Sequence, residues 1–171
     1  MALDELNYQI ISCRSCRLWQ NAEHAVPGEG PLNAKVMLIG QNPGSEEDEQ
    51  GRPFVGRAGK FLTKTLAEFG LKREDLFITN IVKHVSPMNR KPFPDEVKAC
   101  LPYLNQQIDM IKPRVIVLLG ASAKEAPRME GVVYVEVVHP SAAMRFVKMG
   151  DKFRLQIAEL AKLIAEMEKS G

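Results

Sequence analysis

The cysteines are the first residues whose spacing indicates chemistry. The chain has three of them, and two form a Cys13-x-x-Cys16 pair. An odd number of cysteines does not make a disulfide framework, and in a reducing compartment this spacing is typical of metal binding or redox chemistry. The sequence therefore predicts a metal or redox site that involves the N-terminal segment.

Polar residues that could recognise a ligand follow several apolar runs of the chain. The sequence GQNPG occupies 40–44, Asn80 ends a second run, and the sequence HPS occupies 139–141. These segments supply carboxamides and an imidazole, with no Ser or Cys nucleophile beside a base. Such a set favours hydrogen bonding to a polar planar ligand over acyl transfer.

The elements that must position these residues alternate along the chain. Short apolar runs, typical of buried strands, lie at 34–39, 76–82, 114–120 and 132–138. Segments with helical spacing lie at 57–69, 94–111 and 151–168. This alternation predicts an α/β fold, a three-layer sandwich with a central four-stranded parallel sheet. Ligands bind at the carboxyl ends of such strands, where the polar residues stand.

Length and composition favour one domain over residues 1–171. The chain is 45% hydrophobic, and no repeat or linker divides it. Its 23 basic and 21 acidic residues give a net charge of +2, which neither demands nor excludes a nucleic-acid partner. No long apolar run or signal pattern is present in the sequence. We therefore expect a monomeric, cytoplasmic protein with no membrane partner.

Longer motifs around the polar residues carry a family resemblance. The stretch GQNPGSEEDEQGRPFVGRAG at 40–59, ITNIVK around Asn80 and HPS at 139–141 follow one another as three motifs. In them the chain resembles the uracil-DNA glycosylase superfamily, most closely family four, the iron–sulfur type of bacteria and archaea. The resemblance runs from Cys13 to about Arg145.

The resemblance implies a base-excision repair enzyme that works on the nucleoid of a prokaryotic cell. Such an enzyme flips uracil out of DNA and hydrolyses its N-glycosidic bond. The substrate would be DNA with uracil in a U:G mispair or in a single strand. No lysine of the motifs is an obvious Schiff-base nucleophile, so the activity would be monofunctional and leave an abasic site in an intact strand.

The resemblance also implies roles for individual residues. Phe54 would stack on the flipped base, and the carboxamide of Asn80 would pair with O4 and N3–H of uracil. His139 would donate a hydrogen bond to uracil O2 and so stabilise the departing anion. Asn42 would hold the attacking water. Asn42 and His139 are thus the predicted catalytic residues.

The first motif departs from the family pattern. Family four usually reads Gly-Glu-Ala/Gly-Pro-Gly, whereas Gln41-Asn42 here is similar to motifs of the family-one and mismatch-specific enzymes. Backbone N–H groups from Gln41 to Gly44 are further candidates for contacting the base, and Glu47 would border the pocket instead of activating water. Two alternatives follow, namely a broader glycosylase for hypoxanthine or xanthine and a non-catalytic damaged-DNA binder.

Residues near the motifs are expected to contact DNA. Ser86, Ser141 and Arg145 would bind phosphates. Met144 would be the apolar wedge that fills the space left by the flipped base, with Ala143 as an alternative. Basic residues of the same loops would neutralise phosphates or form an ordinary solvated surface. They are Arg52, Arg57, Lys60, Lys83, Arg90, Lys91, Arg145 and Lys148.

A metal centre is also implied by the resemblance. Family-four members hold a [4Fe–4S] cluster with four cysteines, and Cys13, Cys16 and Cys100 match three of them. The remaining ligand is expected sixteen residues before the last, where this chain has His84. Histidine can replace thiolate as an iron ligand, and the residues themselves equally allow a Cys3His zinc site. Either metal would tie the N-terminal segment to the 83–100 loop.

Overall fold

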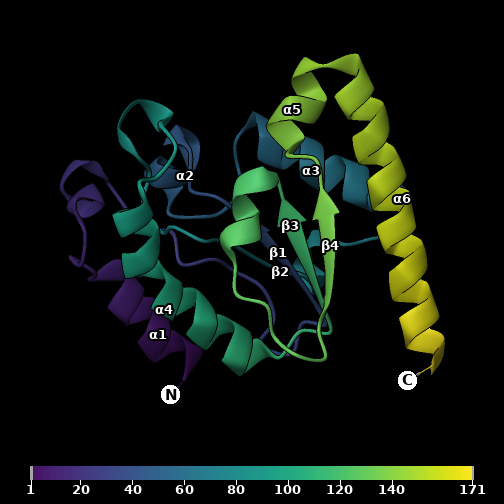
Figure 1. Cartoon of the computed structure of the whole chain (residues 1–171), viewed down its shortest axis with the longest axis horizontal. Helices are drawn as coiled ribbons and strands as arrows, with labels where there is room; N and C mark the ends of the chain where they lie inside the picture. The colour runs from purple at the N-terminus through teal and green to yellow at the C-terminus, as the bar shows by residue number, and fades with distance from the viewer. Residues whose placement is uncertain (1, 171) are drawn as a thin grey trace.

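A four-stranded parallel sheet forms the centre of the fold in a computed structural model that describes residues 2–170 (Figure 1). The strands are β1 (Val36–Gly40), β2 (Phe77–Asn80), β3 (Val115–Leu119) and β4 (Val133–Val137). They lie in the order β2-β1-β3-β4, and every neighbouring pair is parallel. The predicted strands and their parallel arrangement are confirmed.

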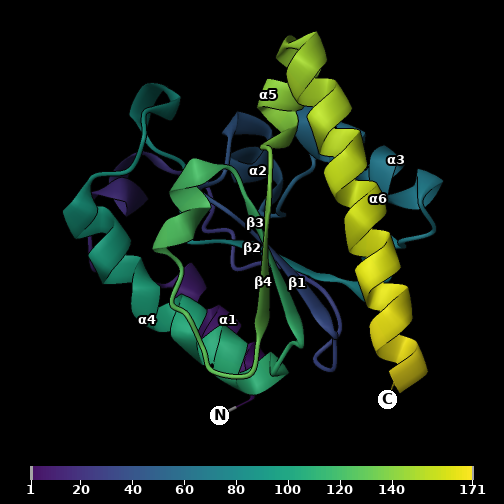
Figure 2. The same ribbon diagram turned by 45° about the vertical axis from the view of Figure 1, so that its right-hand side comes forward.

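Helices cover both faces of this sheet, which confirms the predicted three layers (Figure 2). α1 (Leu3–Ile11) and α4 (Pro94–Ile111) lie on one face, and α3 (Arg57–Glu68) and α6 (Val147–Ser170) lie on the other. Alternate strand residues serve the two cores because successive side chains of a strand point to opposite faces. In β1, Met37 and Ile39 pack in the core with α4. Val36 and Leu38 pack in the core with α3 and α6.

The helices show where sequence periodicity is and is not informative. α3 and α4 match the predicted ranges, whereas α6 begins four residues earlier than expected. α1, α2 (Ser45–Gln50) and α5 (Pro140–Arg145) were not predicted. α2 and α5 have six residues each, fewer than two turns, so no periodic apolar pattern marks them. Short 3₁₀ segments lie at Arg17–Asn21, Arg73–Asp75, Pro87–Asn89 and Ala121–Glu125.

The strand register brings the ends of β1 and β2 to the same level. Gly40, the last residue of β1, pairs with Asn80, the last residue of β2. β4 ends two residues before His139, which is the N-cap residue of α5. The sheet therefore delivers the three predicted motifs to one edge. Within residues 2–170, no helix combines the length and the hydropathy needed to span a membrane.

Candidate active site

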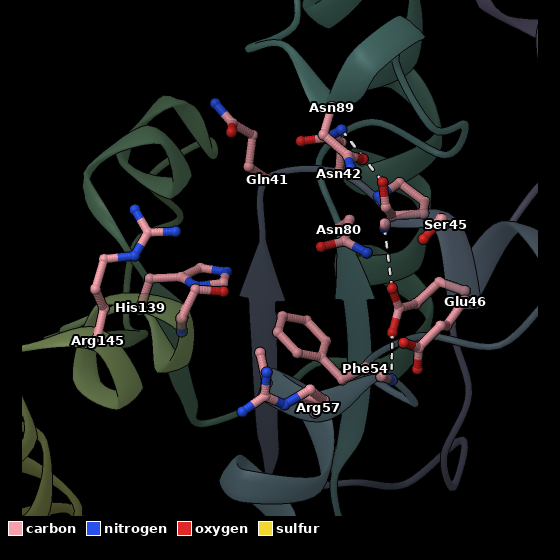
Figure 3. Close-up of a pocket in the computed structure, with 17 residues that line it drawn as sticks. Gln41, Asn42, Ser45, Glu46, Phe54, Arg57, Asn80, Asn89, His139 and Arg145 are labelled. Carbon is pink, nitrogen blue, oxygen red and sulfur yellow. Dashed lines mark hydrogen bonds between the residues drawn. The ribbon is translucent and has the colours of Figure 1, made fainter.

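A cleft with a volume of about 520 Å³ opens at the carboxyl ends of the strands (Figure 3). Nine of the predicted site residues line it: Gln41, Asn42, Gly44, Glu47, Phe54, Asn80, His139, Ser141 and Arg145. They come from the loop after β1, from α2, from the loop before α3, from the end of β2, and from α5 with its N-cap. Residues separated by about a hundred positions thus share one surface, as the parallel sheet predicts.

Asn80 supplies an unused acceptor to the floor of the cleft. Its side chain is 2% exposed, and its Oδ1 is buried without a hydrogen-bond partner. A Cβ on Gly40 would lie 2.4 Å from this Oδ1 and 2.6 Å from the ring of Phe54, so glycine is required beside both. A buried acceptor without a partner costs about 1–3 kcal/mol. A ligand that offers an N–H there recovers this cost.

Phe54 is held in a backbone conformation that few non-glycine residues adopt. Its φ is 48°, in the left-handed region. Its carbonyl accepts a 2.7 Å hydrogen bond from Arg73 Nη1, and a Cβ on Gly59 would lie 2.0 Å from the same oxygen. The ring centroid stands 6.1 Å from that of His139, with the planes 35° apart. Local strain of this kind is common at functional sites, and here it places the ring in the cleft (Figure 3).

The Glu47 carboxylate links the first motif to the loop that carries Phe54 through hydrogen bonds. Its Oε1 accepts from the Gly44 N–H at 3.0 Å. Its Oε2 accepts from the backbone N–H groups of Val55 at 2.8 Å and Gly56 at 2.7 Å. Because three amides occupy the carboxylate, Glu47 borders the cleft as a clamp and is poorly placed to activate water.

His139 presents a defined hydrogen-bond donor. The ring caps α5, and its Nδ1 accepts from the Ser141 N–H at 3.0 Å. Burial lowers the pKa of His139, which favours the neutral ring. With Nδ1 acting as acceptor, the proton of a neutral imidazole is on Nε2. The ring therefore lines the cleft with an N–H donor that carries no full positive charge.

Two residues expected to face DNA are instead buried beneath the cleft. Ser86 is 2% exposed, and its hydroxyl donates to the Arg90 carbonyl and accepts from Asn42 Nδ2 at 3.1 Å. Lys83 is 1% exposed, and burial lowers its pKa to about 7. Its Nζ donates to the Asn80 carbonyl at 2.6 Å, among other acceptors. These side chains support the two asparagines and are not open to a phosphate.

The remaining basic residues of the rim divide into free and paired groups. Arg57 and Arg145 are exposed and line the cleft. Arg52 pairs with Glu29 at 2.8 Å, and Arg90 pairs with Glu96, so both are already engaged within the protein. Of the wedge candidates, Met144 is 40% exposed whereas Ala143 is buried in α5. The structure thus leaves Met144 accessible and removes Ala143 from the surface.

Some cleft residues were missed from the sequence. Ser45 and Glu46 line the cleft from the first turn of α2, directly behind the first motif, and that adjacency was a usable signal. Asn89 reaches the cleft through a 3₁₀ turn in which it has φ 56°. Arg73, which holds the Phe54 carbonyl, lies 19 positions further along the chain. Nothing in the sequence marks Asn89 or Arg73.

The predicted metal ligands gather in one region, which we call the cysteine corner: Cys13, Cys16, His84 and Cys100. Cys13 and His84 line the same hollow. Burial raises the pKa of Cys100 to about 11, and the neighbouring Cys16 and Cys13 add to the rise, so the thiols lie within electrostatic reach of one another. Among residues 2–170, no three potential ligands converge closely enough to enclose a metal ion. The corner thus fits a metal centre in the types of its residues and in their proximity, although their side chains do not converge in this structure.

Comparison with known proteins shows the family to which the chain belongs. Residues 27–162 match the model of the uracil DNA glycosylase superfamily, and the chain belongs to that superfamily. Type-4 uracil-DNA glycosylases of Sulfurisphaera tokodaii and Pyrobaculum aerophilum are 52% and 50% identical to it over 70% and 74% of the chain. The chain spans 54% and 64% of those two proteins. The type-4 enzyme of Archaeoglobus fulgidus is 35% identical over 98% of this chain and 96% of its own length. The predicted type-4 membership is confirmed.

Proposed function

We propose that this protein is a monofunctional uracil-DNA glycosylase. The observation that carries the proposal is the partnerless Oδ1 of Asn80 at the floor of a cleft that also holds an aromatic ring and an imidazole N–H. Uracil offers N3–H to such an oxygen and O4 to the NH₂ of the same carboxamide. Cytosine reverses donor and acceptor at these positions and leaves both groups unsatisfied. Sites built around such a hydrogen bond discriminate by roughly 10⁴ or more.

The other cleft residues fit the electronic demands of the reaction. The C1′–N1 bond breaks with its electron pair going to the base, so negative charge develops on uracil and positive charge on the sugar. Phe54 stacks on the flipped ring, and His139 donates through Nε2–H to the developing charge on uracil O2. Preorganised donors of this kind contribute a large share of enzymatic rate enhancement.

Asn42 positions the water that attacks C1′ of the sugar. A carboxamide oxygen accepts a hydrogen bond from water and so fixes its position, although it is too weak a base to remove a proton. The water oxygen bonds to C1′ and releases a proton to solvent, and the uracil anion takes up a proton from solvent. The products are free uracil and an abasic site in an intact strand.

DNA binding is assigned to the exposed rim. Arg57, Arg145 and Ser141 stand at the cleft edge, where they can contact phosphates on either side of a flipped nucleotide. Met144 is exposed beside Arg145 and serves as the apolar wedge. The free-energy cost of flipping is lowest for a uracil opposite guanine or in a single strand, because less base pairing is lost. One chain carries the whole cleft, which supports action as a monomer. Since the proposed substrate is DNA, we expect the protein to act on the nucleoid of a prokaryotic cytoplasm.

The cysteine corner is proposed to hold a [4Fe–4S] cluster through Cys13, Cys16, His84 and Cys100, with zinc as the alternative metal. The type-4 names of the relatives support the cluster. When bound, it supplies metal–ligand bonds that tie the N-terminal segment to α4. Glycosidic hydrolysis changes no oxidation state, so every step above is assigned to protein side chains.

A broader activity on hypoxanthine or xanthine is the second candidate. Gln41 and Asn89 also line the cleft and offer further carboxamides to a larger deaminated base. A direct comparison of uracil, hypoxanthine and xanthine in otherwise identical oligonucleotides separates the two candidates. Faster release of uracil supports the leading proposal.

The decisive experiment measures free uracil released from an oligonucleotide with one uracil, opposite guanine or in a single strand. Anaerobically purified protein is compared with the Asn42→Ala variant. Release by the wild type with a large loss in the variant supports the glycosylase and the role of Asn42. Binding to uracil-containing DNA without release would contradict the proposal and favour a damaged-DNA binder.

A further inference from the structure

Asn42 can perform its proposed task in only one of two orientations of its side chain. The two ends of a carboxamide have nearly the same shape, but Oδ1 accepts hydrogen bonds and Nδ2 donates them. Holding a water for attack on C1′ requires the accepting oxygen to face the cleft. Something in the protein must therefore decide which end of Asn42 points inward.

The hydrogen bonds of Ser86 decide this orientation. The Ser86 hydroxyl donates to the backbone carbonyl of Arg90, an atom that can only accept. Its single proton is thereby used, so Oγ can only accept from the Asn42 carboxamide. Asn42 Nδ2 meets it at 3.1 Å and directs a second hydrogen bond to the Pro43 carbonyl at 3.3 Å. Both N–H groups of Asn42 are then engaged, and Oδ1 is the atom left for the cleft.

The acceptor of the Ser86 proton is itself held in place. The Arg90 guanidinium donates to both carboxylate oxygens of Glu96, each at 2.8 Å. Glu96 is fully buried and also accepts from the Phe93 N–H at 2.8 Å at the start of α4. The Asn89 N–H donates a hydrogen bond to the Ser86 carbonyl at 3.0 Å. The loop that carries Ser86 is therefore fixed to α4, and the direction of the hydroxyl is fixed with it.

We infer that Ser86 is a positioning residue for hydrolysis, because it forces Asn42 to present its carbonyl oxygen to the attacking water. The inference rests on the proposed glycosylase function and assigns Ser86 a role other than the phosphate contact expected from the sequence. Ser86 does not touch the substrate, and it acts only through Asn42.

A double-mutant cycle tests whether Ser86 acts through Asn42. Single-turnover release of uracil is measured for wild type, Ser86→Ala, Asn42→Ala and the double variant. Thr65→Ala is the matched control, since Thr65 is a buried hydroxyl that donates to a backbone carbonyl within α3, at 2.9 Å. Ser86→Ala is expected to slow release about tenfold, the scale of one hydrogen bond, with DNA affinity unchanged. The double variant is expected to be no slower than Asn42→Ala.

Two kinetic results would overturn the inference. One is a Ser86→Ala variant that releases uracil as fast as Thr65→Ala. The other is a double variant slowed by the product of the two single effects, because independent effects multiply in the rate. Either result leaves the glycosylase itself established, since the wild type would still release uracil.

A second measurement does not depend on activity. In ¹⁵N-labelled protein, the side-chain NH₂ signal of Asn42 is assigned by its loss in Asn42→Ala, and its exchange with solvent is compared with that of exposed Asn33. Slow exchange in the wild type and faster exchange in Ser86→Ala are expected. Exchange as fast as that of Asn33 in the wild type would overturn the inference. If the orientation is seen but no uracil is released, the proposed function fails while the control of Asn42 by Ser86 stands.

Discussion

The cleft and the cysteine corner obtain their geometry in different ways. In the cleft, protein hydrogen bonds orient the side chains, as with the three amides on Glu47 and the Ser141 N–H on His139. In the corner, Cys13, Cys16 and Cys100 are free thiols that lie near one another without converging. The geometry of the cleft thus depends on the fold alone, whereas the corner would obtain its geometry from the proposed metal. Changes in the cleft should affect the reaction rate, and changes in the corner should affect stability.

The largest effect is expected from His139 in the cleft. His139→Ala removes the N–H donor to the leaving base and should lower the rate of uracil release by about 10²–10³-fold, with the protein still folded. Single-turnover kinetics and a thermal melt measure the two quantities. His24→Ala is the control, because His24 is an exposed imidazole bonded only to the Asp48 carbonyl. Equal losses in both variants would refute the assignment of His139.

The next effect concerns the corner and should appear in stability. Removing the proposed metal from the wild type with a chelator should lower its melting temperature by roughly 10 °C, which corresponds to about 3 kcal/mol in a chain of this size. Cys100→Ser should melt at the temperature of the chelated wild type and gain nothing from added metal. The release rate per folded molecule should stay near that of the wild type. A lost rate at an unchanged melting temperature would reverse the proposed division between the two regions.

Lys83 lies between the cleft and the cysteine corner. Its neighbour His84 belongs to the corner, while its Nζ bonds the Asn80 carbonyl in the cleft floor and Gln107 Oε1 at 2.8 Å. Lys83→Met removes the shortest hydrogen bond of each of these buried acceptors and should lower the free energy of unfolding by about 2 kcal/mol. Chemical denaturation measures this, with exposed Lys60→Met as the control. We also expect weaker uracil discrimination, since Asn80 loses its support.

The smallest effect is a pH dependence of the release rate, which the cleft should show through His139. Burial lowers the pKa of His139 below its usual value of about 6.5, so the neutral, active ring persists below that pH. The release rate should be flat above the folded pKa and fall by up to about tenfold per pH unit below it. Below pH 6.5 the unfolded chain binds more protons at this residue than the folded chain does. The free energy of unfolding should therefore also decrease as the pH is lowered through that range. A His139→Gln variant should lose this inflection, and a profile unchanged by that substitution would contradict it.

Much of the fold could be predicted because its signals are local. The apolar runs of the central strands β1 and β3 are continuous, since both strands are buried on both faces. The first motif follows directly behind the run of β1. The sequence wrongly predicted that Lys83 and Ser86 face DNA, because their burial has no local signal. The burial of Lys83 depends on Gln107 of α4, which lies 24 residues further along the chain. The burial of Ser86 depends on how the following loop turns back so that the Arg90 carbonyl meets the hydroxyl. Basic or hydroxyl side chains look the same in a sequence whether they face water or a buried carbonyl.

The strand order has a consequence for a chain that is still being made. Gln41, Asn80 and His139 line the cleft together, and α5, which His139 caps, packs chiefly against α6. Phe153 and Ile157 of α6 complete the core on that side of the sheet. Most of the chain must therefore leave the ribosome before the cleft exists, because domains fold as units. A nascent or truncated chain that lacks α6 is therefore expected to have no assembled cleft.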